Sequence, residues 1–240
     1  MSRDVVVLIA GEKPEGPIQV LRASTGGQVR AEGALTDDGA GLSGLAPERT
    51  LLVLPASLGR LERLTLPAQT NAQAQAAAPF LLQDTLGAQG KDVHIAVGDA
   101  QNTDGTRLAA IIDGALLSAF LDRCARHGAD PGVVLFDCAA LQPPPGLVKM
   151  AILADRIVVG AAGAGGVTLD AGLAGAVLPR WLQALPMTPE WLVFVGPQAQ
   201  AEAAAQGAAR LTRDESGLSP LEVLARDAVS ATAAVPNLRQ

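Results

Sequence analysis

The sequence LVKMAILADRIVVGAAGAGGVTL, residues 147–169, decides the fold of this chain. It contains three short apolar runs rich in β-branched residues, a pattern that predicts buried strands. The expected strands are 147–153, 156–160 and 167–169. Only Ala154 and Asp155 separate the first two runs, which predicts a tight antiparallel hairpin. The glycine-rich residues 160–166 join the second run to the third, so the stretch predicts a three-strand meander.

Helices and strands alternate after this meander. The expected elements are a helix at 172–185, a strand at 191–195, a helix at 197–206, a strand at 209–212 and a helix from 220 to about 229. Pro179 is expected to break the first of these helices, whereas Pro197 suits the first position of the second. The last helix begins at a capping box formed by Ser219 and Glu222.

The N-terminal part of the chain opens with the same kind of meander. Strands are expected at 5–10, 18–22, 28–32 and 51–54. The next block follows the order β-α-β-β-α-β, which is typical of a split βαβ or ferredoxin-like unit. Its expected elements are a strand at 61–66, a helix at 70–86, strands at 92–97 and 106–112, a helix at 114–127 and a strand at 132–136. Gly87 and Asp113 are the expected C-cap of its first helix and N-cap of its second.

A three-strand meander followed by alternating helices and strands is the order of a ribonuclease-H-like half. Two such halves, the first carrying the ferredoxin-like insertion, make up an actin-like α/β fold. We expect the first half at residues 1–58, the inserted module that completes it at 59–142, the second half at 146–230 and a tail at 231–240. The boundary between the halves falls at the stiff segment LQPPPG, residues 141–146. The small and polar residues 230–240 are expected to be loose.

Composition and charge exclude several classes of function. The 240 residues carry a formal net charge of −6, with four Phe, two Trp and no Tyr. The pI of about 4.9 and the scarcity of rings that could stack on bases exclude a nucleic-acid partner. The two cysteines, Cys124 and Cys138, form no CxxC pair, so neither a disulfide framework nor a zinc site is predicted. The sequence has no run of about 20 apolar residues that would predict a membrane span.

An actin-like plan raises the hypothesis of ATP hydrolysis, which needs phosphate-binding turns and a metal-binding carboxylate. The turn after the first strand, residues 10–14, lacks an Asp and carries Glu12, which would repel phosphate. The corresponding turn of the second half, residues 153–156, has Asp155 but no glycine after it. The glycines of 160–166 lie between two predicted strands, where a hairpin loop is expected instead of a dinucleotide site. No catalytic residue and no cofactor is therefore predicted.

The remaining polar candidates have ordinary structural explanations. His94 is expected at the surface of the module, either exposed or hydrogen-bonded, and His127 at the C-terminus of a helix. Cys124, His127 and Cys138 could form a metal site, but Cys124 falls on an apolar stripe and is expected to pack there. Asp137 ends a strand and is expected to act in a turn. No metal site is predicted.

Pro79 lies inside the helix expected at 70–86 and should kink or end it. Together with Phe80, Leu81 and Leu82 it forms an apolar knuckle. Two interpretations stay open for this knuckle, packing in the core or a groove for a partner.

A succession of short motifs surrounds this knuckle. The motifs are LTLP (64–67), APFLLQDTL (78–86), VHIAVG (93–98), CARHGADP (124–131), VLFD (134–137) and VPNLRQ (235–240). Their order and spacing resemble the cytoplasmic domain of the GspL family, the L protein of the type II secretion inner-membrane platform. The resemblance covers nearly the whole chain.

The resemblance implies an actin-like scaffold without ATPase activity on the cytoplasmic face of the bacterial inner membrane. Such a scaffold would dock the N-terminal region of the secretion ATPase GspE, would form a homodimer, and would meet GspM and other platform proteins through parts missing from this chain. Pro236, Asn237, Leu238 and Gln240 resemble the juxtamembrane segment of the family, so a membrane helix is expected downstream. One departure is the uncharged run 69–75, where the family often carries several Arg.

Two alternatives remain at this point. One is a type IV pilus scaffold similar to PilM, which shares the actin-like plan and binds nucleotide and a partner peptide. The other is an actin-like sugar kinase or hydrolase, for which Asp155 is the one residue available. Residues that contact partners are not predicted, because Trp181 and Trp191 have the spacing of core residues. A docking surface on the second half or on the inserted module fits the sequence equally well.

Overall fold

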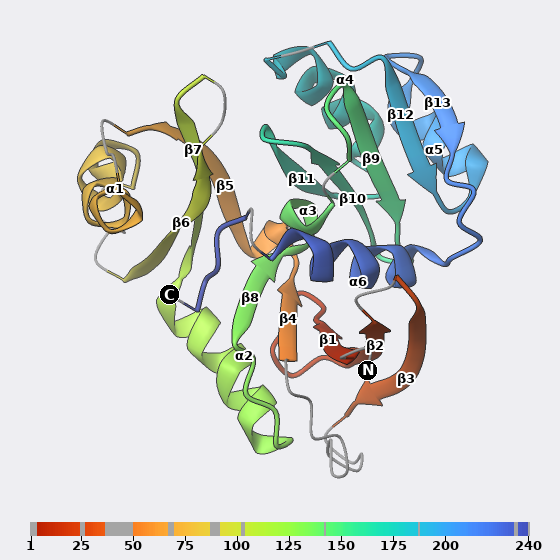
Figure 1. Cartoon of the computed structure of the whole chain (residues 1–240). Helices are drawn as coiled ribbons and strands as arrows, with labels where there is room; N and C mark the ends of the chain where they lie inside the picture. The colour runs from red at the N-terminus through yellow and green to blue at the C-terminus, as the bar shows by residue number, and fades with distance from the viewer. Residues whose placement is uncertain are drawn as a thin grey trace.

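The computed structural model describes residues 4–24, 27–36, 50–66, 70–86, 92–101, 104–141, 143–186, 188–232 and 235–239. Gly87, the expected helix cap, and Gln240 lie outside the described residues. Figure 1 shows two α/β halves on either side of helix α6, with a smaller sheet beside the first half. Within the described residues, no helix is long and apolar enough to cross a lipid bilayer.

The first half is built on a five-stranded mixed sheet in the order β3-β2-β1-β4-β8. Its strands are β1 (Asp4–Ile9), β2 (Ile18–Ser24), β3 (Val29–Leu35), β4 (Thr50–Leu54) and β8 (Val133–Phe136). The β1-β2-β3 meander is antiparallel, whereas β1, β4 and β8 run parallel. β4 is buried along its whole length, which explains why it is a continuous apolar run instead of an alternating one.

The second half repeats this topology with the order β11-β10-β9-β12-β13. Its strands are β9 (Leu147–Ile152), β10 (Arg156–Ala161), β11 (Gly165–Asp170), β12 (Trp191–Val195) and β13 (Arg210–Arg213). Helices α4 (Ala174–Ala184) and α5 (Gln198–Ala205) connect its last strands. In each half the strands counted along the chain lie in the order 3-2-1-4-5, so the prediction of two matching ribonuclease-H-like halves is confirmed.

The inserted module contains a three-stranded antiparallel sheet in the order β5-β7-β6. Its elements are the short 3₁₀ helix η1 (Ala56–Leu58), β5 (Gly59–Thr65), α1 (Asn71–Leu86), β6 (Val93–Gln101) and β7 (Thr106–Asp113). The next elements, α2 (Gly114–Arg126), β8 and α3 (Asp137–Ala140), complete the first half. The predicted β-α-β-β-α-β order is therefore present, but its last strand pairs with β4 and does not join the inserted sheet.

Helix α6 (Pro220–Ala231) packs against β1, β2 and β3 of the first half and against β9 of the second. It begins at the predicted capping box, in which the Ser219 side chain and the Glu222 side chain accept each other's backbone N–H groups. Residues 235–239 of the tail are packed, whereas the sequence predicted a loose segment: Val235 and Leu238 are buried in the core of the first half.

Prolines affect the helices less than the sequence suggested. Pro79 and Pro179 lie inside α1 and α4, and each helix continues past its proline. Pro197 is the N-cap of α5 instead of its first helical residue. A proline removes one helical hydrogen bond, but an apolar face buried on a sheet holds the helix together. In α1 that buried face consists of Ala74, Ala78 and Leu82.

Candidate functional site

The turns that follow β1 and β9 lie together and line one cavity of about 680 Å³. The cavity is lined by residues 9–13 and 152–156, by Gly16, Pro17 and Gln19, and by residues 219–221 at the start of α6. These are the two turns that correspond to the phosphate-binding turns of actin-like enzymes. The structure therefore brings together the parts of both halves that hold nucleotide in an actin-like enzyme.

Arg156 links the two turns across this cavity. Its guanidinium donates to the carbonyl oxygen of Ala10 at 3.1 Å and to the carboxylate of Asp155 at 2.8 Å. Glu12 of the first turn accepts a hydrogen bond from the Ser57 hydroxyl at 3.0 Å. Phosphate binding needs backbone N–H groups that face the ligand. Here a guanidinium instead ties a backbone carbonyl of one half to the other half.

Asp137 is the centre of a buried polar cluster behind this cavity. Its Oδ2 accepts from Arg156 Nε at 3.0 Å, and its Oδ1 accepts from the Ala56 N–H at 3.0 Å, the Cys138 N–H at 2.8 Å and the Thr168 hydroxyl at 2.5 Å. Burial raises the pKa of Asp137, and the charge of Arg156 and these hydrogen bonds oppose that shift. All four partners donate, so the carboxylate acts as an acceptor on both oxygens.

The role expected for Asp137 was that of a turn residue, and this prediction was incomplete. Asp137 starts α3 in the first half, and its partners Arg156 and Thr168 belong to β10 and β11 of the second. The sequence does contain an Asp that follows one strand and an Arg that opens another, but it does not indicate that the two side chains meet. The two residues are 19 positions apart, so no local pattern links them.

Two glycines let α3 pack directly on the backbone of the second sheet. A Cβ on Gly160 would lie 2.2 Å from the carbonyl oxygen of Leu141, and one on Gly166 would lie 2.7 Å from the Cβ of Cys138. The glycine-rich segment forms a hairpin, as predicted. Residues 162–164 are its loop, whereas residues 160–161 and 165–166 are the paired ends of β10 and β11. Two of its glycines therefore serve close packing between the halves.

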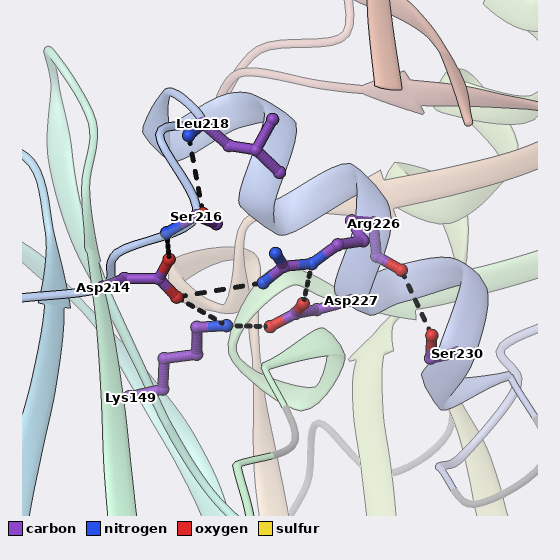
Figure 2. Close-up of polar contacts among 7 residues, drawn as sticks. All are labelled: Lys149, Asp214, Ser216, Leu218, Arg226, Asp227 and Ser230. Atoms are coloured by element: carbon purple, nitrogen blue, oxygen red, sulfur yellow. Dashed lines mark hydrogen bonds and ion pairs between the residues drawn. The ribbon is translucent and has the colours of Figure 1, made fainter. Parts of the chain in front are cut away.

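A second charged cluster fastens α6 to the second sheet. Figure 2 shows Lys149 from β9 and Arg226 from α6 between the carboxylates of Asp214 and Asp227. Lys149 Nζ lies 2.6 Å from Asp227 and 3.5 Å from Asp214, and Arg226 lies 2.9 Å from Asp227. Burial tends to raise the pKa of Asp214, but hydrogen bonds from Ser216 and the two cations lower it. Because α6 also packs on the first sheet, this cluster connects the halves.

Among the residues that the structure describes, large apolar side chains are exposed at two helices, α1 and α4. On α1 of the module, Phe80 is 78% exposed and Leu81 is 49% exposed, whereas Leu82 is buried. The core-packing interpretation of the Pro79 knuckle is therefore wrong for Phe80 and Leu81. In the second half, Leu173 at the N-cap of α4 is 60% exposed and Val177 within α4 is 38% exposed. The sequence signal for the first surface was the absence of charge from residues 71–83.

The two tryptophans are half-buried and do not form such a surface. Arg210 lies over the ring of Trp191, 5.6 Å from its centre. On α2, Arg123 is buried together with the apolar residues Leu117, Phe120 and Cys124. Periodicity alone did not predict a buried arginine at that position.

The predicted juxtamembrane residues are placed against the first half. Pro236 and Leu238 are buried, and the side chain of Asn237 accepts a hydrogen bond from the N–H of Val134 at 2.9 Å. Arg239, the next residue, forms an ion pair with Asp130 at 2.8 Å. Their role next to a membrane stays a prediction.

The histidines and cysteines are spread over separate environments. His94 is hydrogen-bonded to the backbone of Leu238, and burial lowers its pKa. His127 is the C-cap of α2, as expected. Burial raises the pKa of Cys124 to about 11 and that of Cys138 well above its usual value. Among the residues that the structure describes, no group of three or more His, Cys, Asp or Glu side chains could hold a metal ion.

Two matching halves around a cleft, the first with an inserted module, define an actin-like protein. The chain belongs to the family described as type II secretion system (T2SS), protein L, whose model matches residues 11–234. No curated protein matches the chain.

Solved structures show the same fold. The chain is similar to the cytoplasmic domain of EpsL, an inner-membrane component of the type II secretion system of Vibrio cholerae. Identity is 22%, the match covers 99% of this chain and 98% of that one, and the TM-score is 0.74. It is also similar to a chain of the PilM–PilN type IV pilus biogenesis complex. Identity is 10%, the match covers 95% of this chain and 98% of that one, and the TM-score is 0.64.

Proposed function

We propose that this chain is a non-catalytic scaffold on the cytoplasmic face of the inner membrane, where it docks the N-terminal region of the secretion ATPase GspE. Its membership of the protein L family carries this proposal. The proposal includes a homodimer, as well as contacts with GspM and other platform proteins through parts of the full protein beyond these residues. In the full protein, a membrane helix would follow the juxtamembrane residues.

The central cleft supports a role without catalysis. Where an actin-like kinase or hydrolase would present a phosphate loop, Arg156 is engaged with the carbonyl of Ala10 and with Asp155. Asp155, the residue that a hydrolase would need, is thus already in an ion pair. A nucleotide would have to replace these internal contacts before its phosphates could enter.

The exposed face of α1 is the proposed docking surface for the ATPase. Phe80 projects from a helix whose residues 71–83 carry no charge, in a protein with a net charge of −6. Aromatic residues, Phe included, are enriched at protein interfaces. The α4 surface with Leu173 and Val177 is the second candidate, but it lacks an aromatic anchor.

Calorimetric titration with the N-terminal region of the cognate ATPase, without nucleotide, tests the proposal. We expect saturable binding at micromolar affinity or better. Phe80→Ser is expected to weaken binding at least tenfold, a loss of about 1.4 kcal/mol or more. The matched control Val177→Ser, on the other exposed surface, is expected to leave the affinity unchanged.

Two results would contradict this reading. Absence of binding by the wild-type chain would remove the scaffold function, and loss of binding in Val177→Ser alone would move the docking surface to α4.

The second candidate function is a PilM-like scaffold that binds nucleotide, which the 680 Å³ cavity between the two turns favours. Saturable binding of ATP to the wild-type chain would support that alternative.

A further inference from the structure

The segment 235–239, called the strap below, lies along the outer edge of β8. The Leu238 N–H donates to the carbonyl oxygen of Val134 at 2.8 Å, and Asn237 Oδ1 accepts from the Val134 N–H at 2.9 Å. Asn237 Nδ2 also donates to the carbonyl oxygen of Gly132 at 3.4 Å. β8 is the last strand of its sheet, so these bonds satisfy backbone groups of an open edge.

The same strap contacts β6 of the inserted module. A Cβ on Gly98 would lie 3.3 Å from Pro236 Cδ, so the bare backbone of β6 packs on the proline. His94, also on β6, is hydrogen-bonded to the backbone of Leu238. In Figure 1 the dark-blue end of the chain accordingly lies between β8 and the inserted sheet.

Apolar burial holds the strap in this position. Val235 is 4% exposed and Leu238 is 1% exposed. Both belong to the apolar cluster that includes Ala96 of β6 and Leu117 of α2. The strap therefore contacts the module and the first half at the same time.

We propose that the strap is a mechanical link that holds the inserted module in one orientation on the first half. The module is also joined to the halves through η1, through α2 and through the contact of β5 with β11. The strap differs from these links because it contains no strand of either sheet, so it can be displaced without breaking a strand pair.

The consequence for secretion rests on the proposed function. A membrane helix that follows the strap would pull directly on this link, and the module that the link holds carries the exposed face of α1. Displacement of the strap would thereby change the orientation of the surface proposed to dock the ATPase.

Hydrogen exchange of the complete chain, followed by mass spectrometry, tests the link. The variants are Asn237→Ala, which removes three side-chain hydrogen bonds, and Leu238→Ser, which removes the buried anchor. We expect exchange to rise at least tenfold in both β6 and β8 and to stay unchanged in β9 and β12. Leu173→Ser, a substitution of the exposed leucine at the N-cap of α4, is the matched control and should behave as wild type.

Several results would overturn the proposal. They are a rise in the hydrogen-exchange rate confined to β8, an equal rise in β6, β8, β9 and β12, or no rise in either variant. If Leu238→Ser does not fold, Asn237→Ala decides, because it leaves the apolar burial of the strap intact. The exchange pattern needs no ATPase, so the strap and the docking function can fail independently of each other.

Discussion

Arg156→Met removes the cation from the buried cluster between the two halves. Its partner Asp137 is 0% exposed and Arg156 itself is 5% exposed. Loss of one member of a buried ion pair costs about 3–5 kcal/mol, because the other charge stays buried without compensation. The carbonyl of Ala10 also loses its donor, whereas the contact with the half-exposed Asp155 contributes little. We therefore expect the free energy of unfolding to fall by about 3–5 kcal/mol.

Urea unfolding at pH 7, followed by circular dichroism, measures this change. The control is Arg239→Met, which breaks the ion pair with the exposed Asp130 and should cost less than about 1 kcal/mol. Adding Asp137→Asn to Arg156→Met should restore part of the loss, because an amide keeps an acceptor oxygen for Ala56, Cys138 and Thr168 without a buried charge.

The pH dependence gives a further check on the same reasoning. Without Arg156, burial would leave the pKa of Asp137 above its unfolded value. A group with a raised pKa in the folded state destabilises the fold less as the pH falls, because it becomes protonated. The difference in free energy of unfolding between Arg156→Met and wild type should therefore narrow as the pH falls from 7 toward 4. Two results would refute the buried-charge argument. One is a loss of unfolding free energy in Arg156→Met no larger than that in Arg239→Met. The other is a double variant whose unfolding free energy falls by the full sum of the two single-variant losses.

Two further predictions concern the packing between the halves and the start of α6. Gly160→Ala places a Cβ against a backbone carbonyl and should lower the free energy of unfolding by about 1–3 kcal/mol. Gly132→Ala, where no atom lies within 4 Å of the added Cβ, should instead be neutral or stabilising in the same urea experiment. Hydrogen bonds with Ser219 lower the pKa of Glu222 below 4.5, so its charge stabilises the fold above that pH and the contribution is lost as the pH falls through the lowered value. Glu222→Gln should therefore cost about 0.3–1 kcal/mol at pH 7 and progressively less as the pH falls below 4.5, and a cost that does not change with pH would contradict this.

The sequence by itself determined the features that depend on neighbouring residues. The meander of 147–169 follows from β-branched runs and a two-residue turn, and the start of α6 follows from the reciprocal bonds of Ser219 and Glu222. The succession of strands and helices was sufficient to infer the two halves, and the order of motifs was sufficient to infer the protein L family. Each of these inferences uses residues a few positions apart or their order along the chain.

Only the tertiary structure decided which distant segments meet. β8 ends the β-α-β-β-α-β order of the module in sequence but pairs with β4, where its apolar run completes the first sheet. Arg156 binds Ala10 from 146 positions away, and Asn237 binds Val134 from 103 positions away. Phe80 is exposed although it is as apolar as its buried neighbour Leu82. The energy of such contacts depends on burial and on the geometry of both partners, and a local pattern contains neither.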